Sequence, residues 1–455
     1  MPTVAMVGAG SRVFTRRLVS DLSRLFADDV SFRLIDIDGT RLAAALAIAE
    51  RIRAEAGLKP NLAATDDMHK GLAGGADYVV TAVSVGGREA VSRDIDIPAR
   101  YGLRQTFGDT LGIGGVMRAL RTIPVVLNLC RAVQDEAPNA RVLNYTNPMS
   151  MVVMAVTRAL GMPVTGLCHS IPVTAATLAG YLDVAEEELA WLAAGINHQA
   201  WFLELRQRGQ DLYPRLRERW PELRPLDPVR FEIMRKFGYF PSESSPHSAE
   251  YVAFFMRSDR LVADLRIPVA RILDPEFVDA MPSVVELREA MERGETMSLP
   301  ELSHESAPRL IHSIETGTPR VIYVNVPNTG LIPNLPGSAV VEVPAVVTRD
   351  ALLPGHVGPI PASLAGLNSQ GIAVQQLTVE GLLERRREAI HAACMLDPNL
   401  SATLDVDDIV HLTDELIDAH GPLIPPLERT WSKALPLAGL EPPTVAATLT
   451  TEASH

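Results

Sequence analysis

An apolar strand that runs directly into a glycine turn and a helix opens the chain, and this feature restricts the fold more than any other. Residues 3–7 predict the strand, Gly8-Ala9-Gly10 the turn, and residues 11–27 the helix. A second strand at residues 30–35 follows and ends at Asp36. Strands and helices that alternate in this way form parallel sheets with right-handed crossovers. We therefore expect an α/β fold.

The glycine turn has the features of a pyrophosphate-binding site, because backbone N–H groups at the start of the next helix can face phosphate oxygens. Val13 stands where the full dinucleotide fingerprint has its third glycine, so the turn alone is a weak motif. Asp36 stands where a carboxylate accepts hydrogen bonds from a ribose, which favours NAD. Arg33 and Arg41 lie nearby in sequence and leave the 2′-phosphorylated form open. The alternative is a tight strand–helix turn beside a surface aspartate.

The alternation of strands and helices continues to about residue 167. Helices are expected at residues 40–56 and 115–136, and strands at 78–83, 141–143 and 164–167. This pattern predicts an N-terminal, Rossmann-like, doubly wound parallel sheet. Ligands of such sheets bind at the carboxyl edge of the strands.

The alternation of strands and helices stops after about residue 195. An antiparallel strand is expected at residues 202–205, β-like runs at 321–326 and 340–343, and two C-terminal helices at 373–395 and 406–419, with only the last dozen residues loose. We therefore expect two domains. Residues 1–195 form an NAD-binding, Rossmann-like domain, and residues 196–455 form a mixed α+β domain that binds substrate and metal and mediates oligomerisation.

Composition and charge argue against several classes of function. The formal net charge of −13 disfavours nucleic acid and anionic membranes as partners, because both need a basic surface. Three cysteines, Cys130, Cys168 and Cys394, are far apart and odd in number, which fits a reducing compartment and not a disulfide framework. We expect no signal segment before Val4 and no membrane-spanning stretch. The expected location is the cytoplasm.

A cysteine and a histidine give the clearest chemical signal in the middle of the chain. Cys168 follows the strand expected at residues 164–167, and His198 follows 30 positions later. A thiolate and a neutral imidazole suit Mn, Fe, Co, Ni or Zn. Two protein ligands are too few for a closed structural site, so substrate and water would complete the shell. The alternative is a small buried cysteine and a hydrogen-bonded histidine.

Three other segments carry candidate groups. Asn147-Pro148-Met149 ends a strand, where the Asn147 amide can hold a sugar hydroxyl, although Asn-Pro also starts turns. Residues 108–115 are rich in glycine and contain Asp109; they form either a mobile loop over the cofactor or only a helix cap. Residues 238–251 gather titratable and hydroxyl groups, as surface loops also do.

Taken together, these segments resemble glycoside hydrolase family 4, the NAD- and metal-dependent glycosidases. The matching motifs follow the family's order along most of the chain. They are Gly8-Ala9-Gly10-Ser11 with Phe14-Thr15, Asp36-Ile37-Asp38, Tyr101-Gly102, Gly108-Asp109-Thr110, Asn147-Pro148-Met149, Cys168-His169-Ser170, Asn197-His198, Glu250-Tyr251, Asn334-Leu335-Pro336 and Val341-Glu342-Val343-Pro344.

The resemblance implies a lactate/malate dehydrogenase-like Rossmann fold, NAD and Mn²⁺ as cofactors, and a homodimer or homotetramer. It also implies a redox route to glycoside hydrolysis, which is an exception to the scheme of two carboxylates. In this route C3 of the sugar is oxidised, the C2 proton is removed, the aglycone leaves C1, water adds, and C3 is reduced again.

The resemblance also assigns roles to individual residues. In the family's pattern Cys168 and His198 bind the metal, and Asn147 holds the sugar. The residues expected to bind the cofactor are Gly8, Gly10, Ser11, Phe14, Thr15 and Asp36, and the expected catalytic residues are Tyr251, His169 and Asp109.

Tyr251 is the expected base at C2, with Glu250 and Tyr239 as second choices. A phenol needs a nearby cation to lower its pKa for this task. His169 stands where branches of the family that act on 6-phosphosugars have Asp or Asn, and Cys-His-Ser is similar to the α-galactosidase branch. An imidazole titrates near neutral pH, so His169 is the expected proton donor to the leaving group, with water as the alternative.

We therefore expect a small glycoside as substrate, in first place an α-galactoside. An α-glucosidase, an α-galacturonidase and an α-glucuronidase of the same family stay open, and a uronide would need an Arg or Lys to pair with its carboxylate. An NAD-dependent 2-hydroxy-acid dehydrogenase of related fold would instead form NADH without a metal. An NAD-binding sensor would turn over no glycoside.

Overall fold

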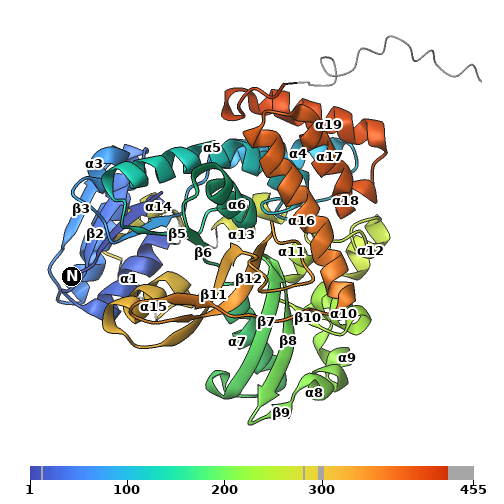
Figure 1. Ribbon diagram of the computed structural model, residues 1–455, viewed down its shortest axis with the longest axis horizontal. Coiled ribbons are helices and arrows are strands. Elements are labelled where there is room, and N and C mark those ends of the chain that lie inside the picture. The colour runs from blue at the N-terminus through green and yellow to red at the C-terminus, as the bar shows by residue number, and fades with distance from the viewer. Residues whose placement is uncertain (12–13, 280–281, 296–301, 429–455) are drawn as a thin grey trace, which may run out of the picture.

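The first half of the chain forms a parallel sheet with the strand order of dinucleotide-binding folds. The computed structural model describes residues 1–11, 14–279, 282–295 and 302–428. The parallel strands are β1 (Thr3–Val7), β2 (Ser31–Ile35), β3 (Leu62–Thr65), β4 (Tyr78–Thr81), β5 (Arg141–Asn144) and β6 (Val164–Gly166). They lie in the order β3-β2-β1-β4-β5-β6 (Figure 1), which is the Rossmann order. The predicted Rossmann-like sheet is confirmed.

Helices cover both faces of this sheet, because alternate residues of each strand face opposite cores. Val4 and Met6 of β1 share a core with α1 and α2, whereas Ala5 and Val7 share one with α5. α5 is long and apolar enough to cross a membrane, but 78% of its most apolar window is buried inside the protein, as in a core helix. The helices of this half are α1 (Phe14–Phe26), α2 (Gly39–Glu55), α3 (Met68–Leu72), α4 (Gly87–Arg100), α5 (Gly112–Glu136) and α6 (Met149–Leu160).

The sheet continues with antiparallel strands from later in the chain. These are β7 (Leu189–Ile196), β8 (Gln199–Gln207), β9 (Gln210–Asp211), β10 (Phe240–Pro241), β11 (Arg320–Pro327), β12 (Val340–Val347) and β13 (Leu352–Pro354). Beyond β6 the order is β11-β12-β7-β8-β10, with β13 paired to β12 and β9 to β8. The mixed character expected of the second half is therefore present. The boundary at residue 195 falls at the end of β7, and the division into two domains stays a prediction.

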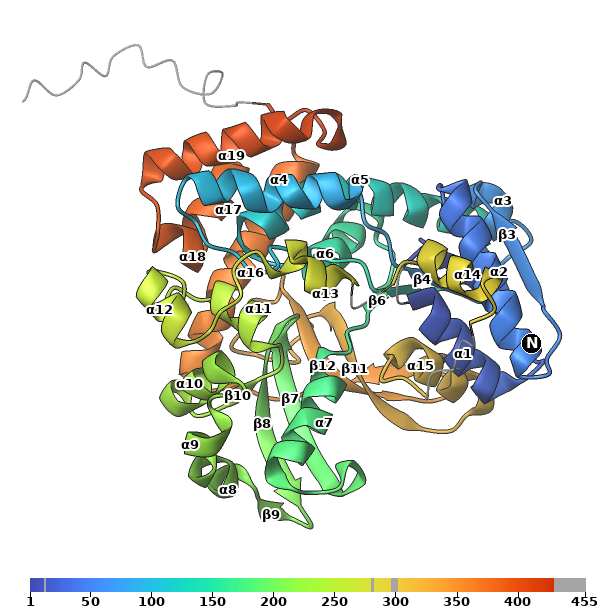
Figure 2. The same cartoon turned by 180° about the vertical axis from the view of Figure 1, so that it is seen from behind.

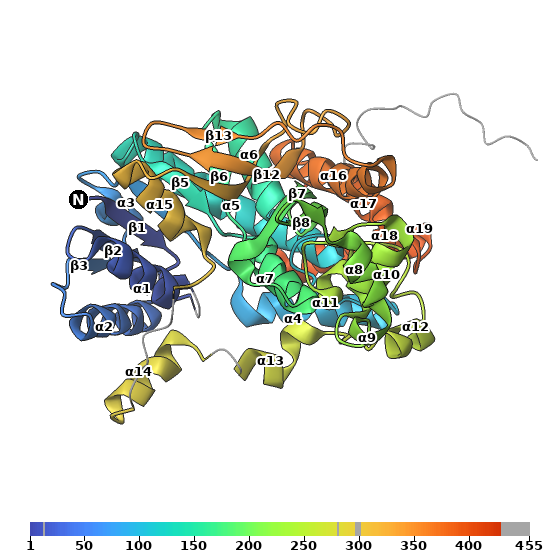
Figure 3. The ribbon, with the colours of Figure 1, turned by 90° about the horizontal axis from the view of Figure 1, so that it is seen from below.

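The remaining helices lie around both parts of the sheet, and those from residue 284 onward pack mainly on helices of the parallel half. They are α7 (Ser170–Leu182), α8 (Tyr213–Glu218), α9 (Trp220–Leu223), α10 (Pro228–Phe237), α11 (Ser245–Glu250), α12 (Asp259–Asp264), α13 (Pro275–Asp279), α14 (Val284–Glu292), α15 (Ser306–Thr316), α16 (Ala362–Leu383), α17 (Arg387–Leu396), α18 (Pro398–Ser401) and α19 (Val406–His420). Figure 2 shows α19 beside α4, and Figure 3 shows α1 and α2 at one end of the molecule with α8, α9 and α12 at the other.

The prediction of one helix over residues 373–395 is wrong. The chain turns between α16 and α17, and Arg385 at the turn has a left-handed φ of 56°. The two helices then pack closely, because Gly381 has no side chain; a Cβ there would lie 2.6 Å from Ile390 Cδ1. No glycine or proline marks the turn itself, so the helical pattern runs through it. The loose end predicted for the last dozen residues lies outside the described residues.

Candidate active site

The glycine turn after β1 is packed so closely that two of its positions accept no side chain. Gly8 has a φ of 85°, and a Cβ there would lie 2.4 Å from the backbone oxygen of Ala82. A Cβ on Gly10 would lie 2.6 Å from Arg41 Cβ and 2.8 Å from Asp36 Oδ2. The N–H of Gly10 donates to Asp36 Oδ2 at 2.7 Å. The turn and the acid form one unit that lets a ligand approach the backbone, as a pyrophosphate must.

Asp36 lies half-buried at the end of β2, beside an exposed apolar side chain. Its Oδ1 accepts the N–H of Asp38 at 2.9 Å, and Ile37 is 92% exposed. An apolar side chain beside an acid that can bind a ribose suits the flat face of an adenine. Arg33 donates to two backbone carbonyl oxygens near the end of α3 at 3.2 and 2.7 Å, and Arg41 pairs with Asp38 at 3.4 Å. Both arginines thus have partners of their own, which favours NAD over a 2′-phosphorylated nucleotide.

Ser11, Phe14 and Thr15 lie where the turn leads into α1. The N–H of Phe14 donates to Ser11 Oγ at 3.3 Å, and the Thr15 hydroxyl donates to the carbonyl oxygen of Ala9 at 2.5 Å. The Phe14 ring packs against that of Tyr145, with centroids 4.7 Å apart. All residues predicted to bind the cofactor therefore lie in this turn, at the start of α1, and at Asp36.

His198 is the second residue of a two-residue turn between β7 and β8, a place where glycine is the ordinary choice. Ile196 pairs with Gln199 across the turn, and His198 has a φ of 62°. This left-handed conformation costs a non-glycine residue about 1–2 kcal/mol. Non-glycine residues in such conformations cluster at functional sites. The imidazole therefore occupies a backbone position that packing alone does not explain.

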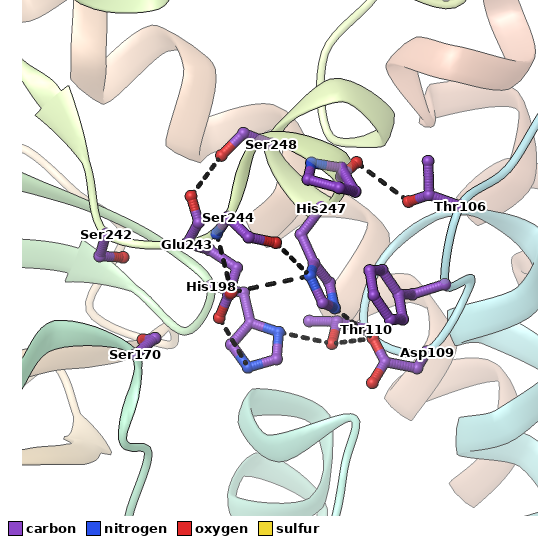
Figure 4. Close-up of polar contacts among 12 residues, drawn as sticks. Thr106, Asp109, Thr110, Ser170, His198, Ser242, Glu243, Ser244, His247 and Ser248 are labelled. Carbon is purple, nitrogen blue, oxygen red and sulfur yellow. Dashed lines mark hydrogen bonds and ion pairs between the residues drawn. The ribbon is translucent and has the colours of Figure 1, made fainter. Parts of the chain in front are cut away.

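The two ring nitrogens of His198 have different partners (Figure 4). Nδ1 lies 2.9 Å from Thr110 Oγ1, and that hydroxyl donates to Asp109 Oδ1 at 2.8 Å. Because a hydroxyl has one proton to donate, Nδ1 carries the proton that Thr110 accepts, and the lone pair of the ring lies on Nε2. Nε2 lies 3.6 Å from Glu243 Oε2. This relay fixes the tautomer that binds a metal through Nε2.

Cys168 is the second residue after the end of β6, and the sheet brings it to His198. Asn325 of β11 pairs with the last residue of β6, and Glu342 of β12 pairs with a residue near the end of β7. The Asn325 amide donates to Glu342 at 3.1 Å, so these two strands hold the ends of β6 and β7 together. As a result the ligand atoms of Cys168, His198 and Glu243 all lie within 4.8 Å of one another.

The charges around this group favour a cation. Burial raises the pKa of the Cys168 thiol well above its usual value, and Glu342 and Glu243 raise it further. Burial also raises the pKa of Glu342, to about 7. For Glu243, burial is outweighed by the neighbouring His247 and His198, which lower the pKa of its carboxyl. A bound cation stabilises a thiolate, and a thiol, an imidazole and a carboxylate are donors that divalent transition metals accept. The residues therefore fit a metal.

Two residues at this site, Glu243 and His247, were not singled out from the sequence, although residues 238–251 contain both. The His247 ring stacks on Phe107 with centroids 3.8 Å apart, and lies between Asp109 Oδ1 at 3.7 Å and Glu243 Oε1 at 3.6 Å. Burial lowers the pKa of His247, but the two carboxylates outweigh it and raise that pKa. Burial would raise the pKa of Asp109, yet His247 holds it well below its usual range. The spacing of four residues between Glu243 and His247 was the feature of the sequence that could have identified this pair.

Tyr251, the expected base, lies at this site. Its Oη is 3.4 Å from His198 Nδ1, and the side chain is buried. Burial raises the pKa of the phenol well above 10, and Asp109 and Glu250 raise it further. Without a cation the phenol is thus protonated.

Neither second choice for the base contacts this group. The Glu250 carboxylate accepts the backbone N–H groups of Thr106, Phe107 and Gly108, with shortest distances of 2.7, 3.3 and 3.1 Å. It therefore holds in place the segment that leads through Asp109 to the start of α5. The Tyr239 ring lies against that of Tyr213, with centroids 6.0 Å apart.

Asn147 joins the site, whereas His169 lies beside it. The Asn147 amide donates to Asp109 Oδ2 at 3.3 Å, and its Oδ1 is buried with no hydrogen-bond partner within the described ranges. A buried acceptor of this kind is satisfied when a ligand hydroxyl donates to it. The His169 side chain is 44% exposed, and its Nδ1 lies 3.6 Å from Glu305 Oε1. It is therefore accessible to a substrate that approaches the end of β6.

Comparisons with known proteins agree with this site. The sequence profile of family 4 glycosyl hydrolases matches residues 3–184, and the profile of the family's C-terminal domain matches residues 193–400. An α-galactosidase of Bacillus subtilis (strain 168) is 38% identical, with 93% of this chain and 99% of the relative covered. An α-galactosidase of Rhizobium meliloti (strain 1021) is 30% identical, with 93% and 89% covered.

A solved structure shows the same fold at low sequence identity. The 6-phospho-α-glucosidase from gut microorganisms in complex with NAD and Mn²⁺ has a TM-score of 0.79 at 21% identity, and the match covers 94% of this chain and 100% of that one. The two profiles together span most of the chain and include the glycine turn, Cys168 and His198. The chain belongs to glycosyl hydrolase family 4.

Proposed function

We propose that this protein is an NAD- and divalent-metal-dependent glycosidase that hydrolyses α-galactosides, with Mn²⁺ as the preferred ion. The observation that carries the proposal is the grouping of the ligand atoms of Cys168 and His198 at the carboxyl edge of a sheet whose first turn fits a dinucleotide. Such a pair is not needed by glycosidases that work with two carboxylates. Two relatives that are 38% and 30% identical to this chain, each over 93% of it, carry the name α-galactosidase.

The binding residues divide between two groups. When bound, NAD supplies a reversible hydride acceptor for C3 of the sugar, and the metal supplies a Lewis acid for the sugar oxygens. Gly8, Gly10 and Asp36 bind the dinucleotide, with Ser11, Phe14 and Thr15 shaping the turn. Cys168 and His198 hold the metal.

Asn147 orients the sugar in this proposal. Its buried Oδ1 accepts a hydrogen bond from a sugar hydroxyl, while its amide stays bound to Asp109. Asp109 contacts Asn147, Thr110 and His247, so we assign it the positioning of these three side chains, in addition to the catalytic role that the sequence predicts.

Two side chains move protons. Tyr251, buried beside His198, removes the proton at C2 of the sugar, and a nearby cation makes its phenol acidic enough to do so. His169, exposed at the end of β6, donates a proton to the leaving oxygen. The burial of Tyr251 and the exposure of His169 support a base inside the site and an acid at its accessible side.

The sugar is proposed from residue 169 and from the relatives' names. His169 replaces the Asp or Asn of branches that act on 6-phosphosugars, which favours a neutral sugar such as galactose. An α-galacturonidase is the second candidate, because Arg118 is close enough to Asp109 to lower its pKa and makes no ion pair among the residues that the structure describes. A guanidinium in that position could pair with a sugar carboxylate. The α-glucosidase and α-glucuronidase alternatives remain outcomes of the same test.

The test is release of 4-nitrophenol from α- and β-linked galactosides, glucosides and uronides, with and without NAD⁺ and Mn²⁺ under reducing conditions. Hydrolysis of the α-galactoside that needs both additives, without accumulation of NADH, is the expected result. Hydrolysis of the galacturonide alone would replace the sugar in the proposal. Net formation of NADH from 2-hydroxy acids would indicate a dehydrogenase, and binding of NAD without turnover of any glycoside would indicate a sensor.

We further propose that the protein works in the cytoplasm as a homodimer or homotetramer, without nucleic acid or membrane partners. Its three cysteines are all buried and free, which supports a reducing compartment. The negative net charge supports the absence of polyanionic partners. Residues 1–195 would bind NAD and residues 196–455 would complete the substrate site and the subunit contacts. Light scattering of the purified protein measures the oligomeric state.

A further inference from the structure

Glu243 faces both His198 and His247, and its two carboxylate oxygens have different surroundings. Oε1 accepts the backbone N–H of Ser244 at 2.8 Å and lies 3.6 Å from His247 Nδ1. Oε2 lies 3.6 Å from His198 Nε2. The side chain is only 16% exposed, so the carboxylate is held in place largely out of solvent.

The distance between Glu243 Oε2 and His198 Nε2 is informative. At 3.6 Å it is too long for a hydrogen bond, and Nε2 has no proton to donate in the tautomer that the Thr110 relay fixes. Two donors that bind one metal at about 2.1 Å lie roughly 3–4 Å apart, depending on the angle between them. The observed spacing fits two ligands of one ion, and the ligand atoms of Cys168 lie within 4.8 Å of both.

Asp109 also lies close to His198, but on the other side of the ring. It reaches Nδ1 through Thr110, whereas Glu243 lies beside the free nitrogen Nε2 and shares a group of ligand atoms with Cys168. The ring therefore divides the two carboxylates between different tasks. Asp109 fixes the imidazole from behind, and Glu243 is left facing the position of the ion.

We propose that Glu243 is a third protein ligand of the metal, completing a set with Cys168 Sγ and His198 Nε2. This inference rests on the proposed function, because it assumes that Cys168 and His198 bind the ion. A thiolate and a carboxylate together balance the charge of a divalent cation, and oxygen donors favour Mn²⁺. Three protein ligands hold the ion before substrate arrives, and they leave the other positions of an octahedral shell for water or sugar oxygens.

The first test measures Mn²⁺ affinity in the NAD⁺-loaded enzyme without substrate, from the EPR signal of free Mn²⁺. Glu243→Gln is expected to weaken Mn²⁺ binding by at least about 10-fold, because replacing even a residue that only hydrogen-bonds to a metal ligand lowers metal affinity by about 10–100-fold. Glu305→Gln is the matched control. Glu305 is a buried carboxylate that pairs with Arg17 and lies near His169, outside the group of three donors, so we expect a change below about 3-fold.

A second measurement needs no variant and so does not depend on the folding of Glu243→Gln. In H₂¹⁷O, broadening of the EPR lines of bound Mn²⁺ counts the water ligands of the wild-type enzyme. Three protein ligands leave about three of six positions for water, whereas two leave about four. About three waters supports the inference, and about four overturns it.

Cys168→Ser separates the inference from the proposed function. If Cys168→Ser loses Mn²⁺ while Glu243→Gln binds it as the wild type does, the role of Glu243 is refuted and the Cys168–His198 site stands. If neither substitution changes the affinity, both the inference and the proposed metal site are overturned. Intact NAD⁺ affinity in each variant shows that the protein has folded.

Discussion

Replacing Thr110 with valine tests how the protein prepares His198 to bind a metal. Valine keeps the shape of threonine but has no hydroxyl. The substitution removes both the acceptor of the Nδ1 proton, at 2.9 Å, and the donor to Asp109 Oδ1, at 2.8 Å. The imidazole then loses the contact that keeps its lone pair on Nε2, and the proton can move to that nitrogen.

The expected loss follows from the geometry. Outer partners of metal-bound histidines contribute about 10–100-fold in metal affinity, or about 1.4–2.7 kcal/mol. Tyr251 Oη lies 3.4 Å from the same nitrogen and offers a longer alternative acceptor. We therefore expect the lower part of this range for Thr110→Val, about 10–30-fold weaker binding of Mn²⁺.

The assay is titration of the NAD⁺-loaded enzyme with Mn²⁺, followed by the EPR signal of the free ion. Thr110→Ser restores the hydroxyl and should bind Mn²⁺ within about 3-fold of the wild type. Neither variant should change NAD⁺ affinity, because Asp36 and the glycine turn are untouched. Wild-type Mn²⁺ affinity in Thr110→Val, or equal losses in the valine and serine variants, would refute the relay.

Three further predictions concern other parts of the structure. Cys168→Ser should abolish Mn²⁺ binding and metal-dependent hydrolysis but keep NAD⁺ binding; calorimetry with each ligand checks this, and full activity contradicts it. Asp36→Ala should weaken NAD⁺ by about 1–3 kcal/mol through unpaired ribose hydroxyls, measured by fluorescence titration, and unchanged affinity moves the ribose site elsewhere. The pKa of His247 is raised in the folded protein, so the protonated imidazole stabilises the fold. This stabilisation is fully present below the ordinary pKa near 6.5 and is lost as pH rises through the folded pKa. The free energy of unfolding of metal-free His247→Asn, measured with urea between about pH 6 and 9, should lack this loss.

The nucleotide-binding half was predictable because its signals are local. A strand, a glycine turn and a helix follow one another within a few residues, and the acid at residue 36 ends the next strand. Parallel strands with helical crossovers then allow few arrangements, so the alternation of elements nearly determines the sheet. The clashes that a Cβ would meet at Gly8 and Gly10 explain why these two positions are glycine.

The second half was less predictable because its decisive contacts are distant in sequence. Glu342 pairs with a residue of β7, and Asn325 with a residue of β6, across separations of well over a hundred positions. No turn motif or hydrophobic periodicity in the sequence predicts pairings between such distant residues. For the same reason the sequence indicated Cys168 and His198 as candidate ligands but not Glu243. The proximity of Glu243 follows only from the path of β10 and α11.

At the turn of His198, a local backbone preference and contacts from a distant segment of the chain act on the same residue. The local backbone conformation, with a φ of 62°, favours glycine at this position. A histidine instead occupies the position, at a conformational cost of about 1–2 kcal/mol, and its ring is fixed by a threonine and an aspartate that come from a different segment. Folding energy alone would select against this arrangement. Seven other described non-glycine residues also have a positive φ, so the backbone conformation alone does not mark a site. At His198 it coincides with a ring that is held by Thr110 and lies beside Cys168 and Glu243, and this combination is an argument that His198 is retained for binding.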